Sequence, residues 1–113
     1  MLKQDNRISR NKDFDRVFKT GQSFYAKVLG AKAVKNDSMI TRFGILVSTK
    51  VSKKAVIRNK IKRQIREISK AELNNLKKGY DVVLIVFPQI LDKNFQELTE
   101  ILKSSFKRLN LYK

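Results

Sequence analysis

The run YDVVLIVF at residues 80–87 is the strongest strand signal in the chain and decides the predicted fold. It is apolar at almost every position, it is rich in β-branched residues, and Pro88 ends it. A continuous apolar run of this length is typical of a strand that is covered on both faces. We therefore expect residues 80–87 to form the central strand of a sheet.

Helices are predicted on both sides of this strand. Between residues 55 and 76 an isoleucine recurs every three or four positions, which indicates one buried helical face. Its members are Ile57, Ile61, Ile65 and Ile68. A last helix is predicted to begin after Asp92 as its N-cap. Its inward residues are expected to be Phe95, Leu98, Leu102, Phe106 and Leu109.

The first half of the chain predicts one short helix and a group of strands. Residues 11–20, NKDFDRVFKT, begin with Asn11 as a candidate helix cap. Two β-like runs at 23–35 and 39–49 flank the turn-forming residues 36–38. We expect the two runs to pair as a hairpin, with a further break inside the first run. The order is then α-β-β-β-α-β-α, an α+β sandwich formed by a single domain over residues 1–113.

The composition points to a polyanionic partner. The chain has 26 Lys and Arg against 10 Asp and Glu, a formal charge of +16, and nucleic acid is the commonest polyanion for a small basic protein. The absence of Cys and His excludes zinc fingers and His-dependent hydrolases. No apolar run approaches the roughly 20 residues of a membrane span. We therefore expect a cytoplasmic protein with no membrane partner.

Residues 50–66 concentrate this charge, with eight basic residues and no acid. On the predicted helix Arg58, Lys62 and Arg66 form one outward row, and Asn59 and Arg63 lie in the neighbouring row. Like charges at this spacing destabilise an isolated helix by roughly 0.2–0.5 kcal/mol per pair. A phosphate-binding face explains such a cluster, because Arg can grip two phosphate oxygens. The alternative is a solvated basic face without a partner.

An aromatic pair lies in the first predicted helix, where Phe14 and Phe18 have the basic neighbours Lys12, Arg16 and Lys19. Such interleaving can form a platform on which single-stranded bases stack. From periodicity alone, a core-facing role for the two rings is the commoner outcome. The paired acids are weaker candidates for metal-dependent chemistry, and no autonomous active site is visible.

These residues together resemble the protein subunit of bacterial ribonuclease P. The resemblance rests on RNKIKR at 58–63 followed by Arg66 and Glu67, which is similar to that family's arginine-asparagine-arginine signature helix, and on RFG at 42–44 leading to Lys50. It covers most of the chain. It implies an α/β sandwich like domain 2 of ribosomal protein S5, with an unusual left-handed βαβ crossover.

The resemblance also implies a function. The chain would be the non-catalytic protein subunit of an endoribonuclease, a cofactor that binds a catalytic RNA and the 5′ leader of precursor tRNA. The RNA, using Mg²⁺, would hydrolyse the phosphodiester bond at the mature 5′ end, and the protein would broaden the range of substrates. No tight metal site on the protein and no DNA partner are expected. A ribosomal or ribosome-assembly RNA-binding protein without a processing role is the alternative.

The resemblance also implies site residues, at the positions of this sequence that match the family's motifs. The signature helix would place RNA contacts at Arg58, Asn59, Lys60, Lys62, Arg63 and Arg66. The leader-binding cleft would contain Phe14, Phe18, Lys50, Lys53 and Lys54, with Lys12, Arg16, Arg42, Phe24 and Tyr25 as further candidates. Position 60 is Lys where the signature has a second Arg, which exchanges a bidentate fork for a point charge. The alignment leaves open whether Phe24, Tyr25 or neither is a third cleft aromatic.

Overall fold

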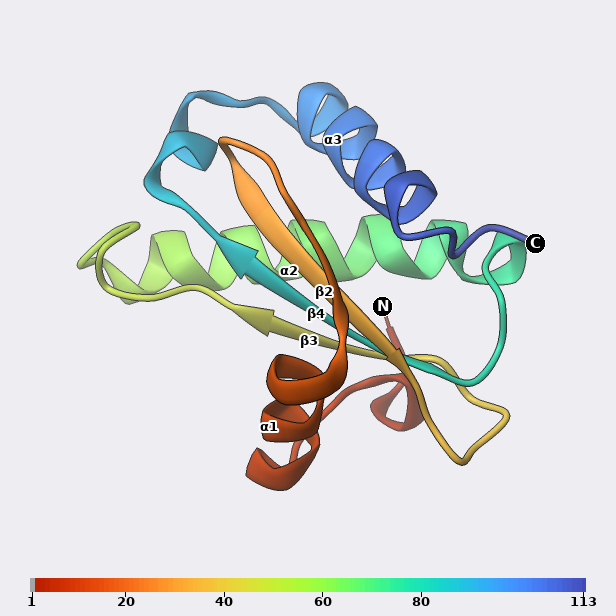
Figure 1. Ribbon diagram of the computed structural model, residues 1–113. Coiled ribbons are helices and arrows are strands. Elements are labelled where there is room, and N and C mark those ends of the chain that lie inside the picture. The colour runs from red at the N-terminus through yellow and green to blue at the C-terminus, as the bar shows by residue number, and fades with distance from the viewer. Residues whose placement is uncertain (1) are drawn as a thin grey trace.

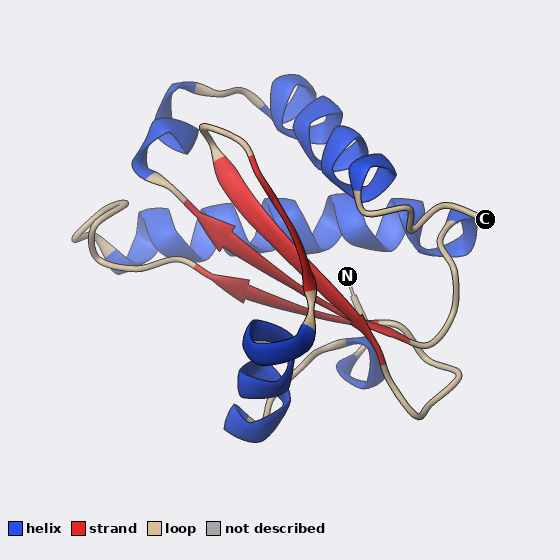
Figure 2. Cartoon of the chain, viewed as in Figure 1, coloured by secondary structure: helices blue, strands red, loops and turns tan. Residues whose placement is uncertain are grey.

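The computed structural model describes residues 2–113, which form a four-stranded sheet with helices on both faces (Figures 1 and 2). The order along the chain contains the three predicted helices and four strands. The elements are η1 (Gln4–Asn6), α1 (Asn11–Thr20), β1 (Gln22–Tyr25), β2 (Leu29–Lys35), β3 (Arg42–Leu46), α2 (Ala55–Glu72), η2 (Leu73–Asn75), β4 (Tyr80–Val86), η3 (Pro88–Asp92) and α3 (Phe95–Arg108).

The strand order is β1-β2-β4-β3, with β4 antiparallel to β2 and parallel to β3. The central position predicted for residues 80–87 is therefore confirmed. The predicted hairpin between 23–35 and 39–49 is wrong, because the most apolar strand, β4, lies between β2 and β3. The hairpin that does form lies within the first run, where β1 pairs with β2.

The loop between β2 and β3 explains this separation. The backbone amide of Asn36 donates to the Gly79 carbonyl at 2.7 Å, and its side chain donates to the Ile40 carbonyl at 3.0 Å. The loop is thus fastened to the start of β4 instead of turning back on β2. In Figure 1, α2 runs behind the sheet as it joins the parallel strands β3 and β4, which gives the left-handed crossover that the resemblance implied.

Alternation along β4 divides the molecule into two layers. Val82, Leu84 and Val86 face the main core beneath α2 and α3, which also holds the predicted isoleucines of α2. Asp81 and Val83 face the other way, toward α1. Helix α1 covers this side of the sheet, whereas α2 and α3 cover the other side (Figure 1).

Two predicted helix starts differ from the structure. Helix α1 has Arg10 as its N-cap, and no side chain caps it, so the Asn11 cap is wrong. Helix α3 is capped by Asn94, not Asp92, because Asn94 and Glu97 form a reciprocal capping box. Phe95 is the first residue of the helix and is 44% exposed, so its predicted inward position is wrong. The other predicted inward residues of α3 are buried.

Candidate nucleic-acid interface

The outward face of α2 carries the predicted RNA-binding residues. Three of them, Asn59, Lys60 and Arg63, are exposed, whereas Arg58, Lys62 and Arg66 are half-buried along the edges of the helix. The Arg58 guanidinium donates to the Ser52 carbonyl at 2.8 Å. Within residues 2–113 none of the five basic side chains makes an ion pair. Their charges are therefore free to meet an external anion.

The loop before α2 adds three exposed lysines, Lys50, Lys53 and Lys54, at the end of β3. Lys54 is itself the N-cap residue of α2, and the first turn of that helix has no acid. Cations are unfavourable at this end of a helix because the macrodipole is positive there. A bound external anion would offset the repulsion between these lysines and the positive end of the helix.

Arg7 extends the basic face, although the sequence pattern gave no sign of it. Its backbone bridges to Phe43 at the edge of β3, and its Nε donates to the Leu2 carbonyl at 3.1 Å. Arg7 therefore lies near Arg66. Burial is the larger cause that lowers the pKa of Arg66, and the positive charge of Arg7 lowers it further. Two neighbouring guanidiniums of this kind would both gain from a bound phosphate.

The two aromatic side chains of α1 differ in burial. Phe14 is half-buried and lies over Gly44, where a Cβ atom would be 2.4 Å from the ring. Phe18 is 37% exposed. The core-facing role that periodicity favoured for both rings therefore applies to Phe14, whereas the ring of Phe18 is accessible to a ligand.

Lys32 joins Phe18 to a second exposed ring. Its Nζ lies 5.7 Å from the ring centroid of Phe18 and 6.0 Å from that of Tyr25, which is 55% exposed. Phe24 lies on the opposite face of the sheet, packed against the main core with Arg108 over its ring at 5.5 Å. Tyr25 is thus the third aromatic on the α1 side, and Lys32 is a cation that the sequence reading missed.

Beside α1 the sheet face remains partly uncovered. Tyr25, Gly30, Ile85 and Leu46 are paired in register across the four strands and so share this face. Leu46 is exposed and Ile85 half-buried, while a Cβ atom at Gly30 would be 2.6 Å from the Tyr25 ring. We call the surface formed by Phe18, Tyr25, Lys32, Ile85 and Leu46 the α1 surface.

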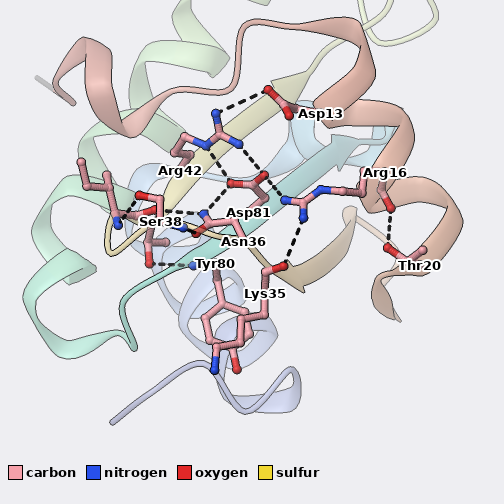
Figure 3. Close-up of polar contacts among 11 residues, drawn as sticks. Asp13, Arg16, Thr20, Lys35, Asn36, Ser38, Arg42, Tyr80 and Asp81 are labelled. Atoms are coloured by element: carbon pink, nitrogen blue, oxygen red, sulfur yellow. Dashed lines mark hydrogen bonds and ion pairs between the residues drawn. The ribbon is translucent and has the colours of Figure 1, made fainter.

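The sequence prediction names three further candidates, Lys12, Arg16 and Arg42. Lys12 is exposed on α1. The guanidiniums of Arg16 and Arg42 converge on the buried carboxylate of Asp81 (Figure 3). Burial tends to raise the pKa of Asp81, but hydrogen bonds from Arg42, Asn36 and Arg16 outweigh it and lower the pKa. Sequence analysis assigned no role to Asp81, because a single polar residue near the start of an apolar strand forms no pattern.

Neither metal-ligand clusters nor membrane-spanning helices were found in the part of the chain that the structure describes. No group of three or more acidic side chains within residues 2–113 could hold a metal ion. No helix in that range is long and apolar enough to cross a membrane.

Comparison with known proteins identifies the family. Residues 2–110 match the family model described as Ribonuclease P. The chain is 36% identical over 110 residues to the ribonuclease P protein component of Clostridium botulinum strain Langeland, covering 96% of this chain and 98% of that protein. It is 40% identical over 105 residues to the corresponding protein of a Pseudanabaena species, covering 92% and 90%.

Solved structures agree. The RNase P protein of Staphylococcus aureus superimposes with a TM-score of 0.88 at 30% identity, over 96% of this chain and 98% of that chain. The RNase P protein of Thermotoga maritima gives a TM-score of 0.82 at 32% identity, over 90% and 96%. The chain therefore belongs to the ribonuclease P protein family.

Proposed function

We propose that the chain is a protein cofactor of ribonuclease P that binds the catalytic RNA through α2 and the 5′ leader of precursor tRNA through the α1 surface. The observation that carries this proposal is the separation of two unlike surfaces on opposite sides of one sheet. The first is basic and nearly free of aromatic groups. The second combines exposed rings with a cation.

The α2 face suits a large folded RNA. Its unpaired basic side chains lie on a rigid helix backed by the main core, so they can neutralise phosphates without a large loss of backbone entropy. Release of counterions from the RNA then supplies the affinity. Asn59 adds a neutral donor and acceptor that can contact a 2′-hydroxyl or a base edge.

The α1 surface suits an unpaired strand. Exposed rings such as Phe18 and Tyr25 can stack on bases, with roughly 1–3 kcal/mol per base, while Lys32 attracts the backbone. A duplex presents no free base faces, so stacking of this kind favours a single-stranded leader. Lys50, Lys53 and Lys54 would meet phosphates where the two surfaces approach each other at the end of β3.

We assign the hydrolytic chemistry to the RNA subunit and its Mg²⁺. The chain has no His or Cys to act as a general base or nucleophile. Its better-placed carboxylates already have structural partners: Asp81 is in the arginine cluster, Glu97 in the capping box and Glu72 on the Tyr112 hydroxyl. They do not fit a tight metal site on the protein.

Reconstitution tests this proposal. The purified chain alone should leave precursor tRNA intact, and with the catalytic RNA it should raise cleavage at low Mg²⁺. The complex should bind precursor tRNA with a 5′ leader more tightly than leaderless tRNA. Equal affinity for the two substrates would contradict leader binding and favour a general RNA-binding role, and cleavage by the chain without RNA would contradict the assignment of chemistry.

A further inference from the structure

We infer that Asp81 is a positioning residue that fixes α1 above the sheet and thereby sets the geometry of the α1 surface. This inference rests on the proposed leader-binding function. It assigns the arginines of the cluster to the protein scaffold, not to the RNA. Asp81 does not touch the proposed ligand, since its side chain is fully buried.

The carboxylate joins four elements of the fold. Arg42 on β3 donates to it twice, from Nε at 2.8 Å and from Nη2 at 2.7 Å, and Arg16 on α1 donates from Nη2 at 2.9 Å. Asn36, in the loop after β2, donates from its side chain at 2.9 Å. Arg42 also reaches Asp13 on α1 at 3.4 Å (Figure 3). Both Asp13 and Arg16 thus connect α1 to one carboxylate on β4.

Helix α1 has few other anchors. Its only fully buried residue is Val17, which packs in a small cluster with Ile8 and Val83, and Phe14 adds a half-buried ring. A helix of ten residues is marginal by itself in water, so its position depends on these tertiary contacts. Loss of the ion pairs would leave the helix held mainly by one small apolar cluster at its centre.

The connection to the ligand surface is short. Phe18 follows Arg16 by two residues on α1, and its ring faces Lys32 on β2. The carbonyl of Lys35, at the end of the same strand, accepts from Arg16 Nη1 at 3.4 Å. A shift of α1 relative to β2 would therefore alter the spacing between the Phe18 and Tyr25 rings and the lysine that they share.

The substitution Asp81→Asn separates positioning from direct contact. It keeps the side-chain size but removes the anion that Arg16 and Arg42 share, so that within residues 2–113 Arg42 retains only Asp13. If Arg16 and Arg42 were leader contacts, releasing them would leave leader affinity unchanged or increase it. If Asp81 positions α1, the reconstituted complex should lose about 2- to 30-fold in affinity for leader-bearing substrate. Its affinity for leaderless tRNA and the affinity of the protein for the catalytic RNA should change less than twofold.

A matched control is Asp15→Asn, which removes one negative charge from an exposed position of the same helix. It should leave the leader preference unchanged. Wild-type protein without any leader preference would contradict the proposed function itself. A leader preference that is normal in wild type and retained in folded Asp81→Asn protein would overturn only the positioning role.

A second measurement covers the case in which Asp81→Asn does not fold. The chain has no native Cys, so spin labels at Lys19→Cys on α1 and Lys27→Cys after β1 can report the position of the helix. The milder variant Asp13→Asn should broaden this distance distribution and reduce leader affinity, although loss of an acid should by charge alone favour RNA. An unchanged distribution together with equal or higher leader affinity would overturn the inference.

Discussion

The α2 face and the α1 surface differ in the partners that the protein gives to their basic side chains. The α2 face is backed by the main core, and within residues 2–113 its basic side chains make no ion pair. On the α1 side, two arginines donate to a buried carboxylate, and the rings of Phe18 and Tyr25 are exposed. Basic residues near a candidate binding surface can therefore either contact a ligand or stabilise the fold. The two roles are distinguished by whether the side chain already pairs with an acid of the protein.

The largest expected effect comes from removing two exposed cations of α2. The double variant Lys60→Ala with Arg63→Ala should weaken binding to the catalytic RNA by about 100-fold at low salt. The slope of log affinity against log salt should fall by about two, since each lost phosphate contact contributes about 0.9. Filter binding across a salt series measures both. Lys107→Ala, an exposed lysine on α3, is the control and should change neither quantity appreciably.

A smaller and more selective effect is expected on the α1 surface. Phe18→Ala should reduce the affinity of the reconstituted complex for leader-bearing substrate by about tenfold, because one stacking platform is lost. Phe95→Ala removes a similarly exposed ring from the start of α3 and should have no such effect. Equal losses with leaderless tRNA would indicate damaged packing of α1 instead of a lost contact.

The packing of α1 on β3 can be tested through Gly44. In Gly44→Ala the new methyl group would overlap the Phe14 ring, so urea unfolding should show a loss of about 1–3 kcal/mol. Adding Phe14→Leu should make the double variant more stable than the sum of the two single losses predicts, because the smaller side chain leaves room for the methyl. Strict additivity would contradict the observed contact.

The smallest expected effect is a pH dependence of the folding stability that arises from Asp81, the carboxylate that anchors α1. Folding lowers the pKa of Asp81 from its ordinary value of 3.8, so the unfolded chain takes up this proton first as pH falls. The stabilising contribution is complete above about pH 5 and is lost as pH falls through the folded pKa. The difference in urea midpoint between wild type and Asp81→Asn should therefore be constant near neutral pH and shrink toward pH 3. A difference that grows on acidification would contradict the assignment.

Sequence patterns predicted the elements well where one periodicity dominated. The isoleucines of α2 and the apolar run of β4 each specify an element and its buried face. Strand pairing was harder to predict, because β2 and β3 are close in sequence and yet β4 lies between them, with Asn36 hydrogen-bonded to Gly79 just before β4. Local patterns carry no information about such a long-range contact.

The same limit applies to the two candidate surfaces. The charge of α2 is visible in the sequence because it lies within one helix. Lys32, Arg7 and Asp81 are single residues on separate elements, and their roles arise only when β2 meets α1, the N-terminal segment meets β3, and β4 receives Arg16 and Arg42. Arg16 was a candidate leader contact as a basic neighbour of the aromatic pair, and Arg42 was one through the family resemblance. In the structure both side chains donate to Asp81.

Binding of two different RNAs by the α2 face and the α1 surface can be measured in one matrix of variants and ligands. Arg63→Ala, Phe18→Ala and their combination are each titrated against the catalytic RNA and, after saturating assembly, against precursor tRNA with and without its leader. We predict that Arg63→Ala weakens only assembly, that Phe18→Ala weakens only leader-dependent binding, and that the combination is additive. Equal losses of both activities in either single variant would contradict binding of the two RNAs by separate surfaces.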